Sequence, residues 1–265
     1  MNKEKLKGKV YFIGAGPGDP ELLTLKGLRL IKEADVILHD RLVSMEILNH
    51  ANSKATIILT GKQKGTQCTP QTAINNLIVD FALQGKNVVR LKGGDVSFFS
   101  NILDELGAVT THQIEFEIIP GVTAASGCAA YCGIPLTARG YSTAVRFITL
   151  HQSKIVEEDN WKELATTSDT LVFYMTFSNL NLLVEQLLSN GVDGNKPVAI
   201  IEQATTPFQR QYFSDLKNAG KDFETIKFTS PATIIVGDVV SLAKKFQWFN
   251  TNEEGVYFKE LNAIK

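Results

Sequence analysis

The stretch that most constrains the fold is residues 9–20, KVYFIGAGPGDP. An apolar run suited to a β-strand ends there at a turn rich in glycine and proline, and residues 21–34 then follow a helical pattern. In α/β proteins, a strand, a glycine turn and a helix bring free backbone N–H groups up to a ligand. The spacing from Gly14 is G-x-G-x-G, with Asp19 where a dinucleotide fingerprint has its third glycine, and Pro17 lacks a donor. The turn predicts a small-molecule site other than a pyrophosphate cradle, with a plain structural turn as the alternative.

Short apolar runs alternate with helix-like segments along the whole chain. The expected strands are residues 10–13, 36–38, 56–59, 88–91, 116–119, 145–150, 171–174, 198–202, 211–213 and 233–236. Because these runs are continuously apolar, they favour an α/β fold with mostly parallel sheets covered by helices. Past Pro120, a stretch of small residues and an extended segment precede a second series of strands and helices. We therefore predict two α/β domains, residues 1–120 and 121–265.

The composition excludes several classes of protein. Lys plus Arg number 27 and Asp plus Glu 28, which argues against general nucleic-acid binding. No run reaches the ~18 apolar residues of a membrane helix, and no signal peptide is visible. We therefore expect a cytoplasmic protein without a nucleic-acid or membrane partner. Cys128 and Cys132 have no further ligand nearby in the sequence, so we expect them in the core and predict no metal site.

Ligands of open α/β sheets bind beyond the carboxyl ends of the strands, so the residues just after each strand are the informative ones. Asp40 follows the strand at 36–38, where a carboxylate is a candidate general base. The alternative is that Asp40 pairs with Arg41 or caps the next helix. The Gly-Gly-Asp turn at 93–95 lets a ligand lie against the backbone, although a simple turn explains it equally.

Cationic side chains also gather near predicted strand ends. They are Lys62, Lys64, Arg90, Lys92, Arg139, Arg146 and Arg210. Several cations around one site would suit a polyanionic substrate, whereas each one alone is more often an ordinary surface residue.

Taken together, the motifs resemble the tetrapyrrole methylase family, the class III S-adenosylmethionine-dependent methyltransferases. The matching stretches are residues 10–19, 23–27, 34–44, 88–95, 120–126, 133–137, 170–175, 197–202, 204–206 and 231–237. They occur in the family's order over nearly the whole chain. The runs DRLVS, from Asp40, and GIPLT, from Gly133, are most similar to family members that act on uroporphyrinogen III.

This resemblance implies both a fold and a reaction. The fold would be two α/β domains with a cofactor cleft between them, in a homodimer. S-adenosylmethionine would be the co-substrate and S-adenosylhomocysteine its product. The reaction would methylate two carbons of uroporphyrinogen III, giving precorrin-2 through precorrin-1, on the way to siroheme or cobalamin.

The resemblance also assigns roles to individual residues. The positions that match cofactor contacts are Pro17, Gly93, Gly94, Asp95, Phe98, Thr123, Ala124, Met175 and Ala204. Asp40 and Lys62 match the general base and the proton donor. Arg41, Lys64 and Arg139 are the expected contacts to the carboxylates of the substrate.

One stretch departs from the family pattern. Where related chains read PFxFGRGGEE, residues 96–105 read VSFFSNILDE, without the proline, the arginine and two glycines. We expect this segment to continue as an ordinary helix and to lack one cationic contact. The alternatives are therefore another precorrin methylase, or a non-catalytic tetrapyrrole- or nucleotide-binding module. An NAD-dependent oxidoreductase fails on the glycine spacing and on Pro17.

Overall fold

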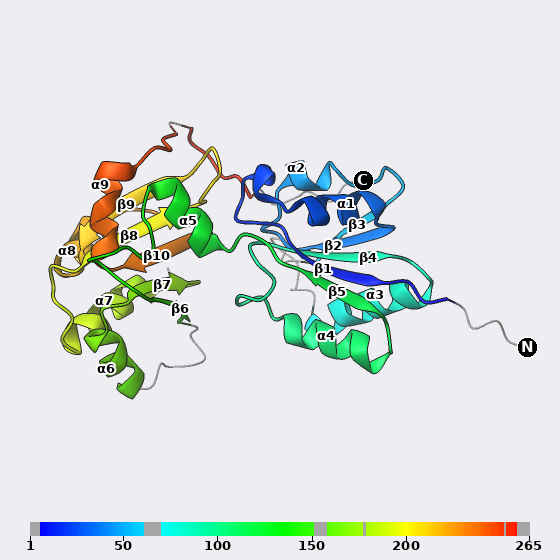
Figure 1. The fold of residues 1–265 in the computed structure, drawn as a ribbon, viewed down its shortest axis with the longest axis horizontal. Helices are drawn as coiled ribbons and strands as arrows, with labels where there is room; N and C mark the ends of the chain where they lie inside the picture. The colour runs from blue at the N-terminus through cyan, green and yellow to red at the C-terminus, as the bar shows by residue number, and fades with distance from the viewer. Residues whose placement is uncertain (1–5, 61–69, 151–157, 177–178, 252, 259–265) are drawn as a thin grey trace, which may run out of the picture. The chain divides into compact units, whose positions relative to one another are not determined.

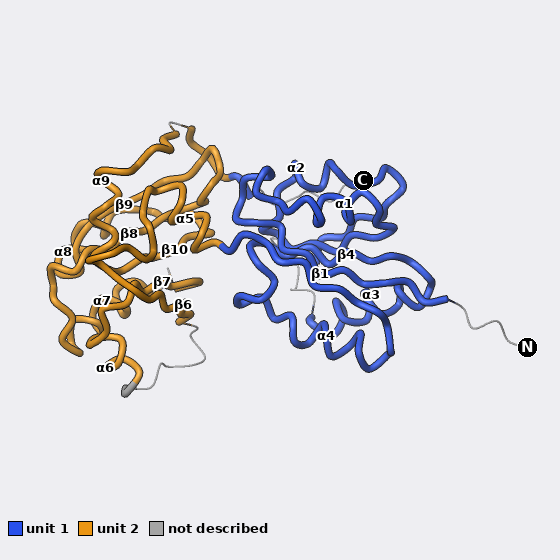
Figure 2. Tube along the Cα trace, in the orientation of Figure 1, with its two compact units in different colours: residues 1–123, 257–265 blue, residues 124–256 orange. Residues whose placement is uncertain are grey.

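A computed structural model describes the chain over residues 6–60, 70–150, 158–176, 179–251 and 253–258 (Figure 1). The chain divides into two compact units, residues 1–123 with 257–265 and residues 124–256 (Figure 2). The predicted domain boundary lies at residue 120, whereas the units separate between Thr123 and Ala124.

The first unit alternates strands and helices around a five-stranded sheet. Its elements are β1 (Val10–Gly14), η1 (Pro20–Leu22), α1 (Leu25–Glu33), β2 (Val36–His39), α2 (Met45–Leu48), β3 (Thr56–Leu59), α3 (Gln71–Leu83), β4 (Val88–Lys92), α4 (Ile102–Thr111) and β5 (Phe116–Ile119). The strand order is β3-β2-β4-β1-β5, and every neighbouring pair is parallel. The predicted α/β class and the parallel sheet are confirmed for this unit.

Helices cover both faces of this sheet, which explains why its strands are mostly apolar. Phe12 of β1 packs with Ile78 of α3 on one face, whereas Ile13 packs with Ile31 of α1 on the other. Successive residues of a strand point to opposite faces, so both must be apolar when both faces are buried.

The second unit holds another five-stranded sheet. Its elements are α5 (Ala124–Cys132), β6 (Val145–Thr149), α6 (Glu158–Thr166), β7 (Thr170–Tyr174), α7 (Leu180–Ser189), β8 (Pro197–Glu202), β9 (Arg210–Asp215), α8 (Leu216–Asp222), β10 (Ala232–Val236), η3 (Asp238–Leu242) and α9 (Ala243–Phe246). The strand order is β6-β7-β10-β8-β9.

The prediction of mostly parallel strands is wrong for this second sheet. Only β6 and β7 pair in parallel, while β10 is antiparallel to both β7 and β8, and β8 is antiparallel to β9. Residues 203–209 connect β8 to β9. A parallel crossover needs about a dozen residues or more, so this connection is long enough only for a hairpin. The central strands β7, β10 and β8 are buried on both faces, and a continuous apolar run does not reveal its direction.

The core of the second unit also lies on both sides of its sheet. Helices α6, α7 and α8 pack on one face, and α5 packs with η3 and α9 on the other. Cys128 and Cys132 of α5 belong to this second layer, so their expected place in the core is confirmed. Burial raises the pKa of the Cys128 thiol to about 11, which keeps it protonated at neutral pH.

The last described residues return to the first unit. Gly255 accepts a hydrogen bond of 3.0 Å from Nε2 of Gln203 in the loop after β8. Tyr257 then donates its hydroxyl hydrogen to Oε1 of Glu46 in α2, at 3.2 Å. The chain thus passes twice between the two units.

Candidate functional site

The loops after β1, β4 and β5 approach one another backbone to backbone. The amide of Gly16 donates to the carbonyl of Gly94 at 3.1 Å, and the amide of Gly94 donates back at 2.7 Å. A Cβ on Gly121 would lie 2.4 Å from the carbonyl oxygen of Gly94, and one on Gly14 would lie 2.7 Å from that oxygen. Such contacts are too close for any side chain. Glycine is therefore required here by the meeting of three loops.

Asp95 ties these loops together. Its Oδ2 accepts a hydrogen bond of 2.8 Å from the amide of Gly121, and its Oδ1 accepts one of 2.7 Å from the amide of Ser97. The side chain is buried. Asp95 therefore shapes the edge of the sheet, and its expected contact with the cofactor stays a prediction.

The order of the strands brings several predicted residues to one edge. Because β2, β4 and β1 are neighbours and parallel, Asp40, Gly93 and Pro17 all follow the same edge of the sheet. A Cβ on Gly93 would lie 2.9 Å from Cβ of Leu42, so the loop after β2 packs directly on the glycine turn after β4.

Asp40 is the most exposed member of a cluster of ion-paired side chains, the others of which are buried. Nη2 of Arg90 donates to Oδ1 of Asp40 at 2.5 Å, and Nε of Arg90 donates to Oε1 of Glu105 at 2.7 Å. Nζ of Lys92 lies 3.1 Å from both oxygens of Glu105. The side chains of Arg90 and Glu105 are 2% and 0% exposed, whereas that of Asp40 is 33% exposed.

The pKa values of Arg90 and Lys92 are lowered by burial and raised by the neighbouring carboxylates. Burial by itself lowers the pKa of Arg90, but the carboxylates of Asp40 and Glu105 raise it above its ordinary value. Burial lowers the pKa of Lys92, and the positive charge of Arg90 lowers it further, against the pull of Asp40 and Glu105. Arg90 is therefore a fixed cation, while Lys92 is the cation that deprotonates more readily.

The carboxylate of Asp40 is held by one oxygen. Within the described part of the chain, its side-chain partners are Nη2 of Arg90 and Oγ1 of Thr60, and both bond to Oδ1. The alternatives from the sequence, a pair with Arg41 or a helix cap, are not observed, since Ser44 caps α2 through its own hydroxyl. This geometry orients the second oxygen of a partly exposed carboxylate, as a general base requires.

The expected substrate contacts are only partly visible. Lys62 and Lys64 lie outside the described residues. Arg41, directly after Asp40, is half-buried at the same edge of the first sheet, and Arg139 is exposed in the second unit. Their roles stay predictions.

The segment that departs from the family pattern is not a continuous helix, so that expectation is wrong for residues 96–101. These residues form turns and bends, and α4 begins only at Ile102. Phe99 and Asn101 have positive φ angles of 53° and 54°, a conformation that interrupts a right-handed helix. The side chain of Phe98, an expected cofactor contact, is partly exposed beside them.

The second unit gathers its own group of predicted residues. The amide of Ala125, next to Ala124, donates to the hydroxyl of Tyr174 at 3.0 Å, so the start of α5 contacts the side chain of the residue before Met175. Met175 is 56% exposed and has a positive φ of 53°. Ala204 follows β8 in the core layer that also holds Ala125.

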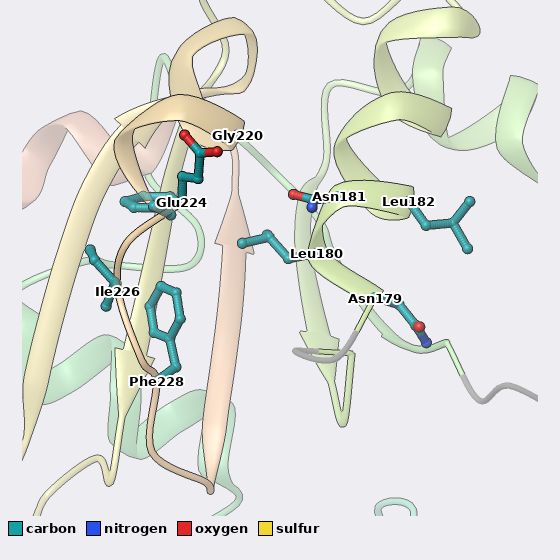
Figure 3. A pocket seen from close by; sticks show the side chains of 9 residues that line it. Asn179, Leu180, Asn181, Leu182, Gly220, Glu224, Ile226 and Phe228 are labelled. Atoms are coloured by element: carbon teal, nitrogen blue, oxygen red, sulfur yellow. The ribbon is translucent and has the colours of Figure 1, made fainter.

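A hollow of about 610 Å³ in the second unit contains none of the predicted residues (Figure 3). It lies between the start of α7 and the chain around Glu224 to Phe228, and its walls are a mixture of leucine, phenylalanine and asparagine side chains. None of its lining residues is among the predicted site residues, so we assign the hollow no role in the chemistry.

Glu105 is the residue that the sequence did not single out. Glu105 keeps the last glutamate of the family pattern PFxFGRGGEE at residues 96–105, and it is completely buried in α4. A second signal was the pair Arg90 and Lys92, two cations on one face of a buried strand, which require an anion opposite them.

Two classes of site find no support among the described residues. They contain no cluster of three side chains able to hold a metal ion. Nor does any of their helices combine the length and apolarity needed to cross a membrane.

Comparison with known proteins agrees with the motifs. Residues 9–220 match the tetrapyrrole (corrin/porphyrin) methylases, an α/β class of methyltransferases. The chain therefore belongs to the tetrapyrrole methylase family. S-adenosylmethionine is the methyl donor of this family, which confirms the expected co-substrate.

Curated relatives include siroheme synthases. That of Saccharophagus degradans is 44% identical over 242 residues, which cover 91% of this chain and 53% of the relative. That of Pseudomonas fluorescens is 45% identical over 242 residues, covering 91% of this chain and 52% of the relative. The chain thus spans about half the length of these relatives.

Solved structures of single methyltransferases match over almost their full length. A uroporphyrin-III C-methyltransferase of Thermus thermophilus, in complex with S-adenosylhomocysteine, is 34% identical with a TM-score of 0.74, and the match covers 88% of this chain and 93% of that one. A cobalt precorrin-4 methyltransferase is 26% identical with a TM-score of 0.79, covering 88% and 95%.

Gly121→Ala is expected to destabilise the protein by about 1–3 kcal/mol, because the new methyl group must push back the carbonyl of Gly94. Gly107→Ala in α4, where a Cβ meets nothing within 4 Å, is the control and should stabilise by about 0.5–1 kcal/mol. Urea unfolding followed by circular dichroism measures both. Equal stabilities of the two variants would contradict the backbone contact.

Arg90→Leu should destabilise the protein by about 3–5 kcal/mol, because it leaves Asp40 and buried Glu105 without the cation that they share. The matched control is Arg29→Leu, which removes an exposed ion pair with Glu33 and should cost less than about 1 kcal/mol. Thermal and urea unfolding compare them. A loss for Arg90→Leu as small as for Arg29→Leu would show that the buried pair is not formed.

Proposed function

We propose that this protein transfers methyl groups from S-adenosylmethionine to two carbons of uroporphyrinogen III, forming precorrin-2 through precorrin-1. The observation that carries the proposal is the carboxylate of Asp40, held by one oxygen beside the glycine turns after β4 and β1. Membership of the family and the likeness to a uroporphyrin-III C-methyltransferase support it.

The chemistry needs placement more than covalent activation. The sulfonium methyl is already electrophilic, so a pyrrole carbon can attack it directly once the two are aligned. A new C–C bond forms, the C–S bond breaks, and its electron pair stays on sulfur as S-adenosylhomocysteine leaves. The ring then carries a positive charge that is relieved by loss of a proton.

We assign the removal of that proton to Asp40. Arg90 and Thr60 occupy Oδ1, so the other oxygen can accept a proton without breaking either contact. Lys62 is proposed as the proton donor. Arg41, Lys64 and Arg139 are proposed to bind the substrate's carboxylates, because guanidinium and ammonium groups bind carboxylates with charge-assisted hydrogen bonds.

We further propose that the methyl donor contacts Pro17, Gly93, Gly94, Asp95 and Phe98, together with Thr123, Ala124, Met175 and Ala204. The glycines leave backbone groups accessible, and the exposed side chain of Met175 offers an apolar surface. The homodimeric state stays a prediction of the same resemblance.

A second candidate is a precorrin methylase acting on a later intermediate. The segment 96–101 favours it, because the turn holds Asn101 where members acting on uroporphyrinogen III carry an arginine. The structural similarity to a cobalt precorrin-4 methyltransferase also favours this second candidate. Mass spectrometry of the product, counting added methyl groups, separates the two.

The direct test is to incubate the purified protein with S-adenosylmethionine and enzymatically generated uroporphyrinogen III without oxygen. We expect the precorrin-2 chromophore and a mass increase of two methyl groups. Binding of S-adenosylhomocysteine with no methyl transfer to uroporphyrinogen III would contradict the proposal.

Asp40→Asn is expected to slow turnover by about 100-fold or more, because the amide cannot accept the proton. The affinity for S-adenosylhomocysteine, measured by isothermal titration calorimetry, should change by less than about threefold. Asp104→Asn, the same change on the exposed side of α4, is the control and should leave both unchanged. Equal losses of binding and turnover in Asp40→Asn would show that Asp40 is structural.

A further inference from the structure

Two cations of β4 point to the same side of the first sheet. Arg90 and Lys92 are two residues apart on the strand, so both side chains face α4. Their side chains are 2% and 4% exposed. Two positive charges this close and this deeply buried repel each other and require anions nearby.

Glu105 of α4 neutralises both of them. Its Oε1 accepts from Nε of Arg90 at 2.7 Å, and Nζ of Lys92 lies 3.1 Å from each of its oxygens. With Asp40 and Glu105 each at −1 and Arg90 and Lys92 each at +1, the four groups sum to zero. Glu105 and Asp40 contact different nitrogens of Arg90, Nε and Nη2 respectively.

Without Glu105, the two cations would share one anion. Lys92 already lies within the electrostatic field of Asp40. An unpaired ammonium in a medium of low dielectric moves to the nearest carboxylate. Lys92 would then compete for the oxygen of Asp40 that Arg90 leaves available.

We infer that Glu105 is a positioning residue, which holds Lys92 and Nε of Arg90 so that one oxygen of Asp40 stays available to take a proton. The inference rests on the proposed role of Asp40 as the base. A purely stabilising role explains the cluster less well, because replacing a buried ion-pair cluster by apolar side chains is often neutral or stabilising.

The test compares Glu105→Gln with the double variant Glu105→Gln/Lys92→Met, which restores a neutral cluster. Glu105→Gln should reduce kcat by about 100-fold, with KM for S-adenosylmethionine and affinity for S-adenosylhomocysteine changed by less than about threefold. The double variant should recover kcat to within about threefold of the unmodified protein. Glu117→Gln is the control, because Glu117 also bonds two lysines, Lys9 and Lys26, but at an exposed position.

The pH dependence gives a readout that a structural role would not change. The charged groups facing Lys92 are Arg90 on its own strand, Glu105 on α4 and Asp40 after β2. Burial lowers the pKa of Lys92, and loss of Glu105 removes one of the charges that raise it. Turnover of Glu105→Gln should therefore rise with pH relative to the unmodified protein, as Lys92 becomes neutral and releases Asp40.

A crystal structure of Glu105→Gln separates this inference from the proposed function, because it requires no turnover. We expect Nζ of Lys92 within hydrogen-bond distance of the carboxylate of Asp40. Unchanged contacts of Asp40, or an unchanged kcat, would overturn the inference. If the single variant does not fold, the double variant decides: recovered turnover supports the inference, and a folded, inactive protein that binds S-adenosylhomocysteine overturns it. If the unmodified protein transfers no methyl group, the proposed function fails and the crystal structure alone decides the inference.

Discussion

Three loops of the first unit meet with no room for a side chain, and the rest of the candidate site depends on that contact. Gly14 and Gly121 lie so close to Gly94 that a Cβ added to either would overlap the carbonyl oxygen of Gly94. Since the loops follow β1, β4 and β5, the contact fixes the positions at which three strands end. Asp95 then holds the arrangement with two backbone hydrogen bonds. A surface made of backbone in this way can lie against a ligand that a side chain would exclude.

The charge cluster beneath this surface has a different purpose from the glycines. Burying charged groups costs free energy, and the pairing of Arg90 with Asp40 and Glu105 offsets that cost without making the site stable for its own sake. What the cluster supplies is orientation. Nη1 of Arg90 donates to the carbonyls of Leu38 and Leu91, which holds its guanidinium group toward Asp40. Glu105 holds Lys92 by an ion pair. The carboxylate that faces outward is therefore held in place from inside the sheet.

Much of the first unit could be predicted from sequence, because most strands there are short, mainly apolar runs that end at glycine, aspartate or proline. Those residues are chosen by backbone geometry, which leaves a visible pattern. The direction of β8 and β10 could not be predicted, because a strand buried on both faces reads the same in either direction. The role of Glu105 could not be predicted either, because it arises from contacts between distant segments. The turn at residues 96–101 could not be predicted, because its positive φ angles fall on Phe99 and Asn101 and not on glycines.

The path of the chain makes the second unit an insertion into the first. Residues 124–256 leave the first unit after Thr123, and the chain returns at Tyr257 to bond with Glu46. During synthesis, the first unit therefore acquires its last described contact only after the whole second unit has emerged. A single cut in either connection leaves the two units joined by the other. The unit that carries Asp40 thus combines the earliest and the latest described segments of the chain.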